Sequence, residues 1–238
     1  MSVIIFTSCV EPNNNILVSR NTNRKIEVIA NIKSFYENKC HHFFDQVILI
    51  DCSINPQVSE ELFKEVRKLT GNLDIIFYHI VFLAQELNDI SLRGKGFSEL
   101  LMLTKAINQI PIINQNIVKI SARYKPKSWR AFLDELKLSD ESKRVKISFS
   151  KLRGVALTYA FSITNSALSE FDEKYRNSID DRAGCYIEHN FYKFLSKMHR
   201  SDVERVYIQK YFNHITSGST GMRPGFLKSL ARNIVYYL

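Results

Sequence analysis

The segment at residues 46–51, QVILID, decides the fold class of this chain. An unbroken run of β-branched and aliphatic residues is typical of a strand that is buried on both faces. Residues 3–6, VIIF, have the same character, and residues 25–37 between the two runs place apolar side chains at helical spacing. This order of strand, helix and strand predicts a parallel α/β unit.

The same alternation continues toward the C-terminus. Residues 58–70 predict a second helix, which Gly71 closes as a C-cap. A third strand at 74–82, a third helix at 97–108 and a fourth strand at 116–121 follow. The first half therefore predicts an open, mostly parallel sheet that is flanked by helices and binds its ligands at the carboxyl ends of the strands.

The second half of the chain is less regular and helix-rich. Its patterns predict helices at 129–136, 166–175, 185–197 and 202–212, and strands at 146–149 and 155–161. Internal repeats and linkers rich in Pro, Gly or Ser are missing from the sequence. We therefore expect one domain over residues 1–238.

Basic residues are concentrated in the second half. Residues 1–118 carry 11 Lys and Arg against 12 Asp and Glu, whereas residues 119–238 carry 22 against 12. This density suits phosphate-bearing ligands, nucleic acid or an anionic membrane face. A nucleic-acid-binding module is one alternative, because Tyr124, Trp129 and Phe132 lie among the cations. Helix-turn-helix, zinc-finger and RNP motifs are not found, which disfavours that alternative.

The sequence gives no sign of membrane spans or export. Its apolar runs are shorter than the roughly 20 residues that cross a bilayer, and its start lacks the basic residues of a secretory signal, so we expect a cytoplasmic protein. Cys9, Cys40, Cys52 and Cys185 form no C-x-x-C pair. We interpret them as reduced core cysteines.

Polar and basic residues follow the first predicted strand. Thr7 and Ser8 end that strand, and Arg20 and Arg24 precede the first helix. The free N–H groups of a helix start and two guanidiniums suit the phosphates of a nucleotide. The alternative is a solvated loop with two surface arginines.

An acid ends the second predicted strand. Asp51 at that position can accept hydrogen bonds from a ribose or a base. The alternative is that Asp51 caps the N–H groups of its own loop.

The segment RGKGFSELL opens the third helix with Lys95 between Gly94 and Gly96, and with Glu99 in the first turn. The glycines permit close backbone approach, Lys95 supplies a point charge, and Glu99 can orient a sugar hydroxyl or a basic partner. The segment is neither a Walker loop nor a G-x-G-x-x-G dinucleotide motif. The alternative is an ordinary helix-opening turn.

The fourth strand continues into IVKISARYKPK. Strand alternation places Lys119, Ser121 and Arg123 on one side of this extended segment, facing the ligand edge of the sheet.

These motifs resemble bacterial glycosyltransferases that build lipopolysaccharide O-antigen and capsular polysaccharide. The likeness rests on a K-G-x-x-E helix start and on a strand that ends K-I-[ST]-[GA]-R-Y about 20 residues later, and it covers most of residues 3–126. Its matching residues are Lys95, Gly96, Glu99, Lys119, Ile120, Ser121, Ala122, Arg123 and Tyr124. Farther on, GCYIEH at 184–189 and SGSTG at 217–221 are similar to an acidic helix and a late glycine turn of such enzymes.

The resemblance implies a GT-A-like fold, a nucleotide-sugar donor with a UDP-sugar favoured, and a lipid-linked or growing surface glycan as the acceptor. Residues 1–126 would bind the donor, and residues 127–238 would bind the acceptor and hold the catalytic groups. The donor-binding residues would be Thr7, Ser8, Arg24, Asp51, Lys95, Gly96, Glu99, Lys119, Ser121, Arg123, Tyr124, Gly218, Ser219, Thr220 and Gly221.

One departure from the family is the missing Asp-x-Asp metal motif. Asp180-Asp181 is the nearest substitute, with a helix N-cap as its alternative role, so Mg²⁺ or Mn²⁺ stays open without an assigned ligand. We expect Lys95, Lys119 and Arg123 to stabilise the leaving nucleoside diphosphate in place of a metal. An inactive GT-A-like partner subunit is a further alternative.

An inverting transfer needs a carboxylate that takes the proton of the acceptor hydroxyl. Our candidate is Glu188, held ionised by the helix dipole, with Asp181 behind it and His189 as a third choice. The alternative is that Glu188 pairs with a nearby Lys or Arg and secures its helix.

Two features are predicted near the C-terminus. Gly218 and Gly221 can form a nest of N–H groups for a diphosphate beside Arg223. Residues 223–238 predict a basic amphipathic helix, which would lie on anionic lipid at the inner face of the cytoplasmic membrane or dock on the core.

Overall fold

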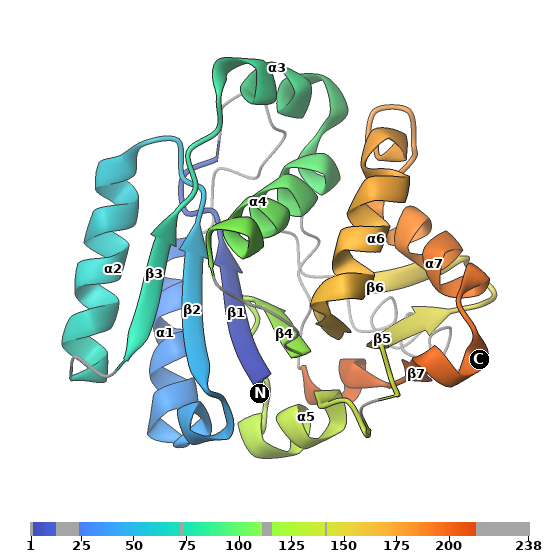
Figure 1. Cartoon of the computed structure of the whole chain (residues 1–238). Helices are drawn as coiled ribbons and strands as arrows, with labels where there is room; N and C mark the ends of the chain where they lie inside the picture. Colours follow the sequence, from blue (N-terminus) through green and yellow to red (C-terminus); the bar gives the residue numbers. More distant parts are fainter. Residues whose placement is uncertain (1, 13–23, 72–73, 111–115, 141, 213–238) are drawn as a thin grey trace, which may run out of the picture.

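The computed structural model describes residues 2–12, 24–71, 74–110, 116–140 and 142–212. In these residues one seven-stranded sheet has the order β3-β2-β1-β4-β6-β5-β7 (Figure 1). The strands are β1 (Ser2–Ser8), β2 (Gln46–Asp51), β3 (Ile75–His79), β4 (Asn116–Ser121), β5 (Val145–Ser150), β6 (Val155–Thr164) and β7 (Val203–Arg205).

Seven α-helices and four short 3₁₀ helices accompany the sheet in the described residues. The α-helices are α1 (Arg24–Glu37), α2 (Pro56–Thr70), α3 (Ala84–Arg93), α4 (Lys95–Gln109), α5 (Trp129–Leu136), α6 (Asn165–Tyr175) and α7 (Ile187–Lys197). The 3₁₀ helices are η1 (Cys40–Phe43), η2 (Arg176–Ser178), η3 (Arg200–Asp202) and η4 (Ile208–Tyr211).

The predicted parallel sheet is confirmed. Strand β1 pairs in parallel with both β2 and β4, and β2 pairs in parallel with β3. Strand β6 pairs antiparallel with β4 and β5, and β5 pairs in parallel with β7. The sheet is thus mostly parallel, and the carboxyl ends of β1, β2, β3 and β4 share its upper edge in Figure 1.

Helices cover both faces of the sheet, as predicted for strands without polar alternation. Helices α4, α6 and α7 pack on one face with Ile48 and Ile50, whereas α1, α2 and α5 pack on the other with Val47 and Leu49 (Figure 1). All four of these β2 side chains are at most 4% exposed. Burial of apolar area on both faces stabilises the sheet by about 25 cal/mol per Å².

Several boundaries are confirmed by the structure. Strands β2 and β4 and helix α5 begin and end where the sequence predicts, and Gly71 closes α2 in the left-handed conformation with φ 64°. The sequence did not predict α3, because Ile90 is the one buried residue of this helix and leaves no apolar stripe.

The helix predicted at residues 202–212 is wrong. Residues Val203–Arg205 form β7 beside β5, and η4 follows after two residues. The carboxylate of Glu204 lies 2.7 Å from the ammonium of Lys146 on the neighbouring strand. Pairing with β5 decides the structure of this segment, because a three-residue strand is too short to show a period in the sequence.

The interpretation of all four cysteines as core residues is also wrong. Cys40 is buried, but Cys9 and Cys52 are half-buried and Cys185 is exposed. All four are free thiols.

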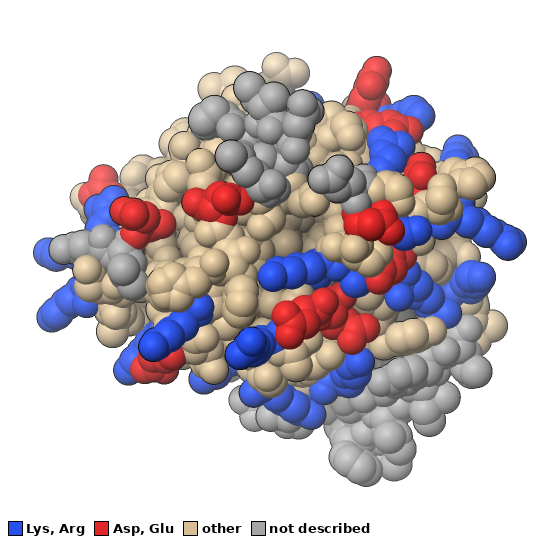
Figure 2. Space-filling model, turned by 60° about the horizontal axis from the view of Figure 1, so that its bottom comes forward, with Lys and Arg blue, Asp and Glu red and all other residues tan. Residues whose placement is uncertain are grey.

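The excess of basic residues is interleaved with acids on the surface. In Figure 2 the molecule is turned so that the bottom of Figure 1 comes forward. On this face, Lys and Arg side chains are interspersed with Asp and Glu. Ion pairs such as Arg144–Glu170 (2.7 Å) and Lys210–Glu135 (3.0 Å) join residues of the basic half. Within the described residues, no helix has the length and apolar character needed to cross a bilayer.

Candidate functional site

Six predicted site residues, together with Glu27, form two groups at the carboxyl edge of the parallel strands. We name Arg24, Glu27 and Arg123 the arginine cluster, and Lys95, Glu99, Asp181 and Glu188 the carboxylate cluster. The arginine cluster lies on the side of α1, and the carboxylate cluster lies between the starts of α4 and α7.

The arginine cluster begins at the first residue of α1. The Arg24 guanidinium donates through Nη1 to the carbonyl of Cys9, at 2.9 Å. Arg123 follows β4 and donates through Nε to the Glu27 carboxylate, at 2.7 Å. Burial and the neighbouring positive charge of Arg123 lower the pKa of Arg24. Two cations and one carboxylate therefore meet at the N-terminus of a helix, which favours an anionic ligand.

The position of Arg123 is fixed by the buried amide of Asn31 in α1. Asn31 donates to the carbonyls of Ala122 (3.0 Å) and Tyr124 (3.1 Å), on either side of Arg123. The Nη2 atom of Arg123 is buried, and none of the described residues accepts a hydrogen bond from it. A buried donor without an acceptor is costly, and an oxygen of a bound anion can satisfy it.

Asp51 adopts the alternative role that the sequence left open. Its carboxylate is fully buried and accepts hydrogen bonds from the Ser8 hydroxyl, the Ser59 hydroxyl (2.5 Å), and the backbone N–H groups of Val10 (3.2 Å) and Ser53 (3.0 Å). Asp51 thus joins the ends of β1 and β2 and the start of α2. Its direct contact with a ribose or base stays a prediction.

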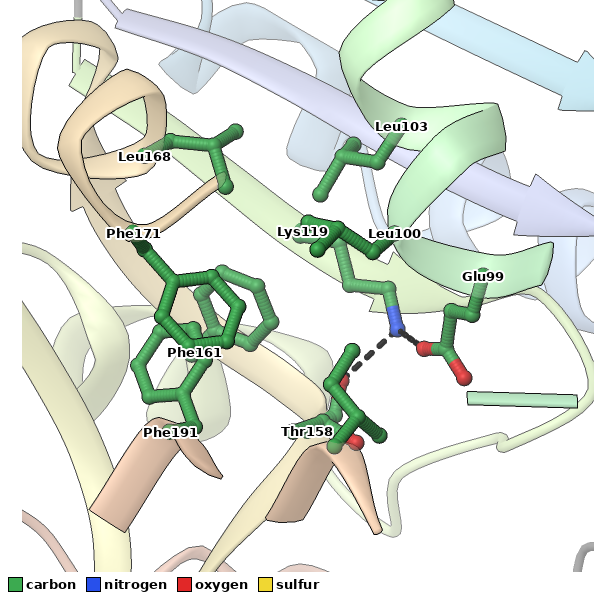
Figure 3. Close-up of a pocket in the computed structure, with 10 residues that line it drawn as sticks. Glu99, Leu100, Leu103, Lys119, Thr158, Phe161, Leu168, Phe171 and Phe191 are labelled. Atoms are coloured by element: carbon green, nitrogen blue, oxygen red, sulfur yellow. Dashed lines mark hydrogen bonds and ion pairs between the residues drawn. The ribbon is translucent and has the colours of Figure 1, made fainter. Parts of the chain in front are cut away.

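A buried ion pair supports the carboxylate cluster (Figure 3). The Lys119 side chain is 1% exposed, and its ammonium donates to the Glu99 carboxylate and to the carbonyl of Thr158 at 2.7 Å. Burial opposes ionisation of Glu99, but Lys119 and Lys95 outweigh it, so the pKa of Glu99 is lowered. The stem of Lys119 lines a small, mostly apolar cavity with the ring of Phe161 and neighbouring side chains.

Asp181 closes the start of α4 from the other half of the chain. Its Oδ2 atom accepts from the backbone N–H of Gly96 at 2.9 Å, while its buried Oδ1 atom has no partner among the described residues. A Cβ atom at Gly94 or Gly96 would come within 2.8 Å of Asp181. The close backbone approach expected of these glycines is therefore made by a carboxylate of the chain itself.

Glu188 lies in the first turn of α7 and is half-buried. Burial raises the pKa of Glu188, the charges of Glu99 and Asp181 raise it further, and Lys95 opposes them. Desolvation therefore opposes the ionised form, and the expectation that the helix dipole holds Glu188 ionised stays a prediction. The charge of Lys95 acts on Glu188, so pairing with a nearby Lys stays an alternative role for this carboxylate.

Asp181 shares this environment. Burial raises the pKa of Asp181 as well, against the hydrogen bond from Gly96 and the charge of Lys95. A carboxyl group with a raised pKa is a stronger base once it is ionised. The carboxylate cluster can therefore accept a proton from a hydroxyl group.

Cys52 connects the two clusters. The charges of Asp51 and Glu99 both contribute to the raised pKa of its thiol, after its hydrogen bond with Cys9 and its burial. The Arg24 guanidinium in turn interacts with Cys9 and Cys52. The exit of β2 is therefore within electrostatic range of both clusters.

The structure separates two cations that the sequence placed together. Lys119 lies within β4, points toward α4 and is neutralised by Glu99, whereas Arg123 lies beyond the strand and reaches α1. The expectation that both share one side of an extended segment is wrong, because residues 122–123 form a turn. Lys119 supports Glu99, whereas Arg123 pairs with Glu27 and lies close to Arg24.

The remaining predicted residues have other surroundings. Thr7 is buried in β1 opposite the half-buried Ser121 of β4. The ring of Tyr124 packs against Tyr159 at 5.3 Å. Lys95 is exposed at the start of α4. Four groups of expectations lie outside the described residues: Arg20, the turn Gly218, Ser219, Thr220 and Gly221, Arg223, and the helix at 223–238.

Asp180 and His189 have local roles in the structure. Asp180 accepts from the backbone N–H groups of Arg182 (2.9 Å) and Ala183 (3.0 Å) and so orders its own turn. The ring of His189 packs on Tyr186 at 5.4 Å.

Three residues of the site were not predicted from the sequence: Glu27, Asn31 and Thr158. Asn31 left one signal, because it occupies the buried stripe of α1 between Val28 and Ile32, where a polar residue needs a partner. Thr158 acts through its backbone carbonyl, which no side-chain pattern reveals.

The carboxylate cluster does not fit a divalent cation. Glu99 is engaged by Lys119, Asp181 is engaged by Gly96, and the described residues contain no group of three His, Cys, Asp or Glu side chains arranged to hold a metal.

Comparison with known proteins gives only distant likenesses. No family model matches the chain. No curated protein matches it either. Among solved structures, it is similar to the galactosyltransferase LgtC in complex with donor and acceptor sugar analogs, at 12% identity and a TM-score of 0.48 over 85% of this chain and 72% of that one.

Two further solved structures show the same level of similarity. The glycosyltransferase GlyE of Streptococcus pneumoniae TIGR4 matches at 11% identity and a TM-score of 0.49, over 88% of this chain and 46% of that one. A nucleoside-diphosphate-sugar pyrophosphorylase from Vibrio cholerae RC9 matches at 10% identity and a TM-score of 0.43, over 82% and 88%. At these values the likeness carries no inference about activity.

Proposed function

We propose that this chain is a GT-A-like glycosyltransferase that moves a sugar from a nucleotide-sugar donor, a UDP-sugar, to a lipid-linked or growing bacterial surface glycan. The observation that carries the proposal is the buried, unpartnered Nη2 atom of Arg123, which lies beside Arg24 at the start of α1. A diphosphate supplies the oxygen that this donor lacks and the negative charge that two guanidiniums attract.

In the proposed reaction, the arginine cluster stabilises the charge that develops on the leaving diphosphate. Preorganised cations in a partly desolvated site are effective there, because they need no reorganisation as the glycosidic bond breaks. We expect Lys95, the exposed cation of the carboxylate cluster, to act on the same charge.

The carboxylate cluster provides the base. Ionised Glu188 takes the proton of the acceptor hydroxyl, and burial, followed by the charges of Glu99 and Asp181, raises its proton affinity. Attack from the face opposite the leaving group inverts the anomeric centre. The lipid-linked acceptor and a peripheral place on the inner membrane face rest on the basic segment 223–238, which lies outside the described residues.

Thermal unfolding with a panel of nucleoside diphosphates, each with and without Mn²⁺, tests the donor site. A ligand that binds only the native state stabilises it by about 2.7 kcal/mol at 100 times its Kd. We expect UDP to raise the Tm most. Slow hydrolysis of the matching UDP-sugar without acceptor would support catalysis, whereas binding without hydrolysis would indicate an inactive subunit.

Arg123→Ala tests the observation that carries the proposal. Loss of a charge-assisted donor to the leaving phosphate should lower kcat/KM by roughly 100-fold. The matched control is Lys68→Ala, which removes a basic side chain from the last turn of α2 and should leave kcat/KM unchanged. Full activity of Arg123→Ala, measured with the same donor, would overturn the assignment.

A further inference from the structure

Two thiols lie side by side where β1 and β2 end. The parallel register places Ser8 opposite Asp51, so the next residues along the two strands are Cys9 and Cys52. The Cys9 thiol lies 3.7 Å from the carbonyl oxygen of Cys52, and the Cys52 thiol lies 3.6 Å from the carbonyl oxygen of Ser8. Each thiol therefore reaches across to the neighbouring strand.

The two thiols are also close enough to interact, because Cys9 is the first cause of the raised pKa of the Cys52 thiol. Adjacent strands lie about 4.8 Å apart, which is within the Cα separation of about 4.4–6.8 Å that a disulfide spans. Both cysteines are free and half-buried.

We propose that Cys9 and Cys52 are a thiol–disulfide exchange site that accepts small-molecule disulfides and closes into a reversible intramolecular bond. The Cys9 thiolate attacks one sulfur of the small disulfide, which forms a mixed disulfide and releases one thiolate. Cys52 then loses its proton and attacks the Cys9 sulfur, which forms the Cys9–Cys52 bond and releases the second thiolate. Two protein thiols are oxidised, and one small disulfide is reduced to two thiols.

The bond would act on the arginine cluster, and this part rests on the proposed function. The carbonyl of Cys9 accepts the hydrogen bond from Arg24. The Ser53 hydroxyl, next to Cys52, accepts from the backbone N–H groups of Val10 (3.1 Å) and Glu11 (3.0 Å). Drawing the two strand ends together shifts this network and moves Arg24, so the oxidised protein should bind nucleoside diphosphate more weakly.

The experiment uses the full chain with C40S/C185S, which leaves Cys9 and Cys52 as its thiols. Incubation with oxidised glutathione should abolish both titratable thiols, remove two hydrogens from the intact mass, and yield a Cys9–Cys52 peptide that dithiothreitol cleaves. In C9S/C40S/C185S, the matched control, the remaining Cys52 cannot form the bond. Persistent glutathione adducts on both cysteines, disulfide-linked dimers, or two unreacted thiols would each overturn the proposal.

The functional part has a separate readout. The Kd for UDP, measured by calorimetry, should rise roughly 10-fold on oxidation of C40S/C185S, about 1.4 kcal/mol, and recover on reduction. An unchanged Kd with the bond formed would refute the effect on the arginine cluster. Absence of UDP binding in both states would refute the proposed function, while the mass and thiol readouts still decide the exchange site.

Discussion

Lys119 shows how a single buried charge is made tolerable. Its ammonium is inside the protein, next to the ring of Phe161, and relies on Glu99 and the carbonyl of Thr158. Transfer of an unpaired ammonium from water into such surroundings costs several kcal/mol. Glu99 therefore stabilises the fold, besides shaping the electrostatics of Glu188.

Glu99→Leu should lower the free energy of unfolding by about 3–5 kcal/mol, because it leaves the Lys119 ammonium buried without its partner. The double variant Glu99→Leu/Lys119→Met removes both charges and should recover most of the loss. Urea denaturation of the wild type, the single variant and the double variant measures the free energy of unfolding of each. A double variant as unstable as the single one would contradict the role of the ion pair.

The pKa of Glu99 is lowered in the folded protein, so the contribution of this carboxylate to the free energy of unfolding depends on pH. A carboxyl with a lower pKa in the folded state stabilises the protein above its ordinary pKa of about 4.3. This stabilisation is lost as the pH falls through the lowered value.

Glu188→Gln should lower kcat/KM for transfer by roughly 100-fold to 10,000-fold, since the amide cannot accept the hydroxyl proton. Because burial raises the pKa of Glu188, wild-type kcat/KM should fall as the pH drops through that raised value, and the variant should lose this limb. His189→Gln is the matched control and should keep both rate and limb. The pH dependence of kcat/KM of both variants measures this. If His189→Gln lost the rate and the limb while Glu188→Gln kept them, His189 would be the base.

At the scale of elements, α4 and α7 meet through a glycine. A Cβ atom at Gly96 would lie 2.8 Å from Oδ1 of Asp181 and 3.1 Å from Cβ of Ile187, the first residue of α7. The residue before the helix, Gly94, has φ 95° and a similar clash with Asp181. These glycines let the turn before α7 rest on the N-terminus of α4.

Gly96→Ala should destabilise the protein by about 1–3 kcal/mol, as overpacking does. The direction of the change in stability is informative, because Gly→Ala at an open helical position stabilises a protein by about 1 kcal/mol. Calorimetric Tm values of Gly96→Ala, Asp181→Ala and the double variant form a cycle. We expect the clash to be relieved in the double variant, and strict additivity would contradict contact between the two positions.

At the scale of the molecule, the continuous sheet links both halves of the chain. Strand β4 of the first half pairs with β6 of the second, and the backbone N–H of Gly96 donates to Asp181 at 2.9 Å. Ion pairs such as Lys146–Glu204 add contacts within the basic half.

We therefore expect one cooperative unfolding transition, in agreement with a single domain over residues 1–238. Trp129, the one tryptophan of the chain, is buried against Phe6 and Phe35 and reports on the α1 side of the sheet. Its fluorescence and the far-UV circular dichroism should show coincident transitions in urea. Separate midpoints would indicate two folding units.

The sequence by itself determined the parallel strands, most of the helices and the edge at which the candidate residues lie. Continuous apolar runs such as QVILID can be satisfied only between two layers of helices, and a strand with its carboxyl end at an edge carries Ser8, Asp51 and Ser121 there. Periodicity and caps are local signals, so they need no knowledge of the rest of the chain.

Only the tertiary structure decided which residues are partners. Asp181 reaches Gly96 across 85 positions, Cys9 meets Cys52 across 43, and the turn at 122–123 parts Arg123 from Lys119. The short strand β7 exists because β5 offers it an edge. Contacts between distant residues leave no period in the sequence, and the cost of burying a charge such as that of Lys119 depends on neighbours that only the fold supplies.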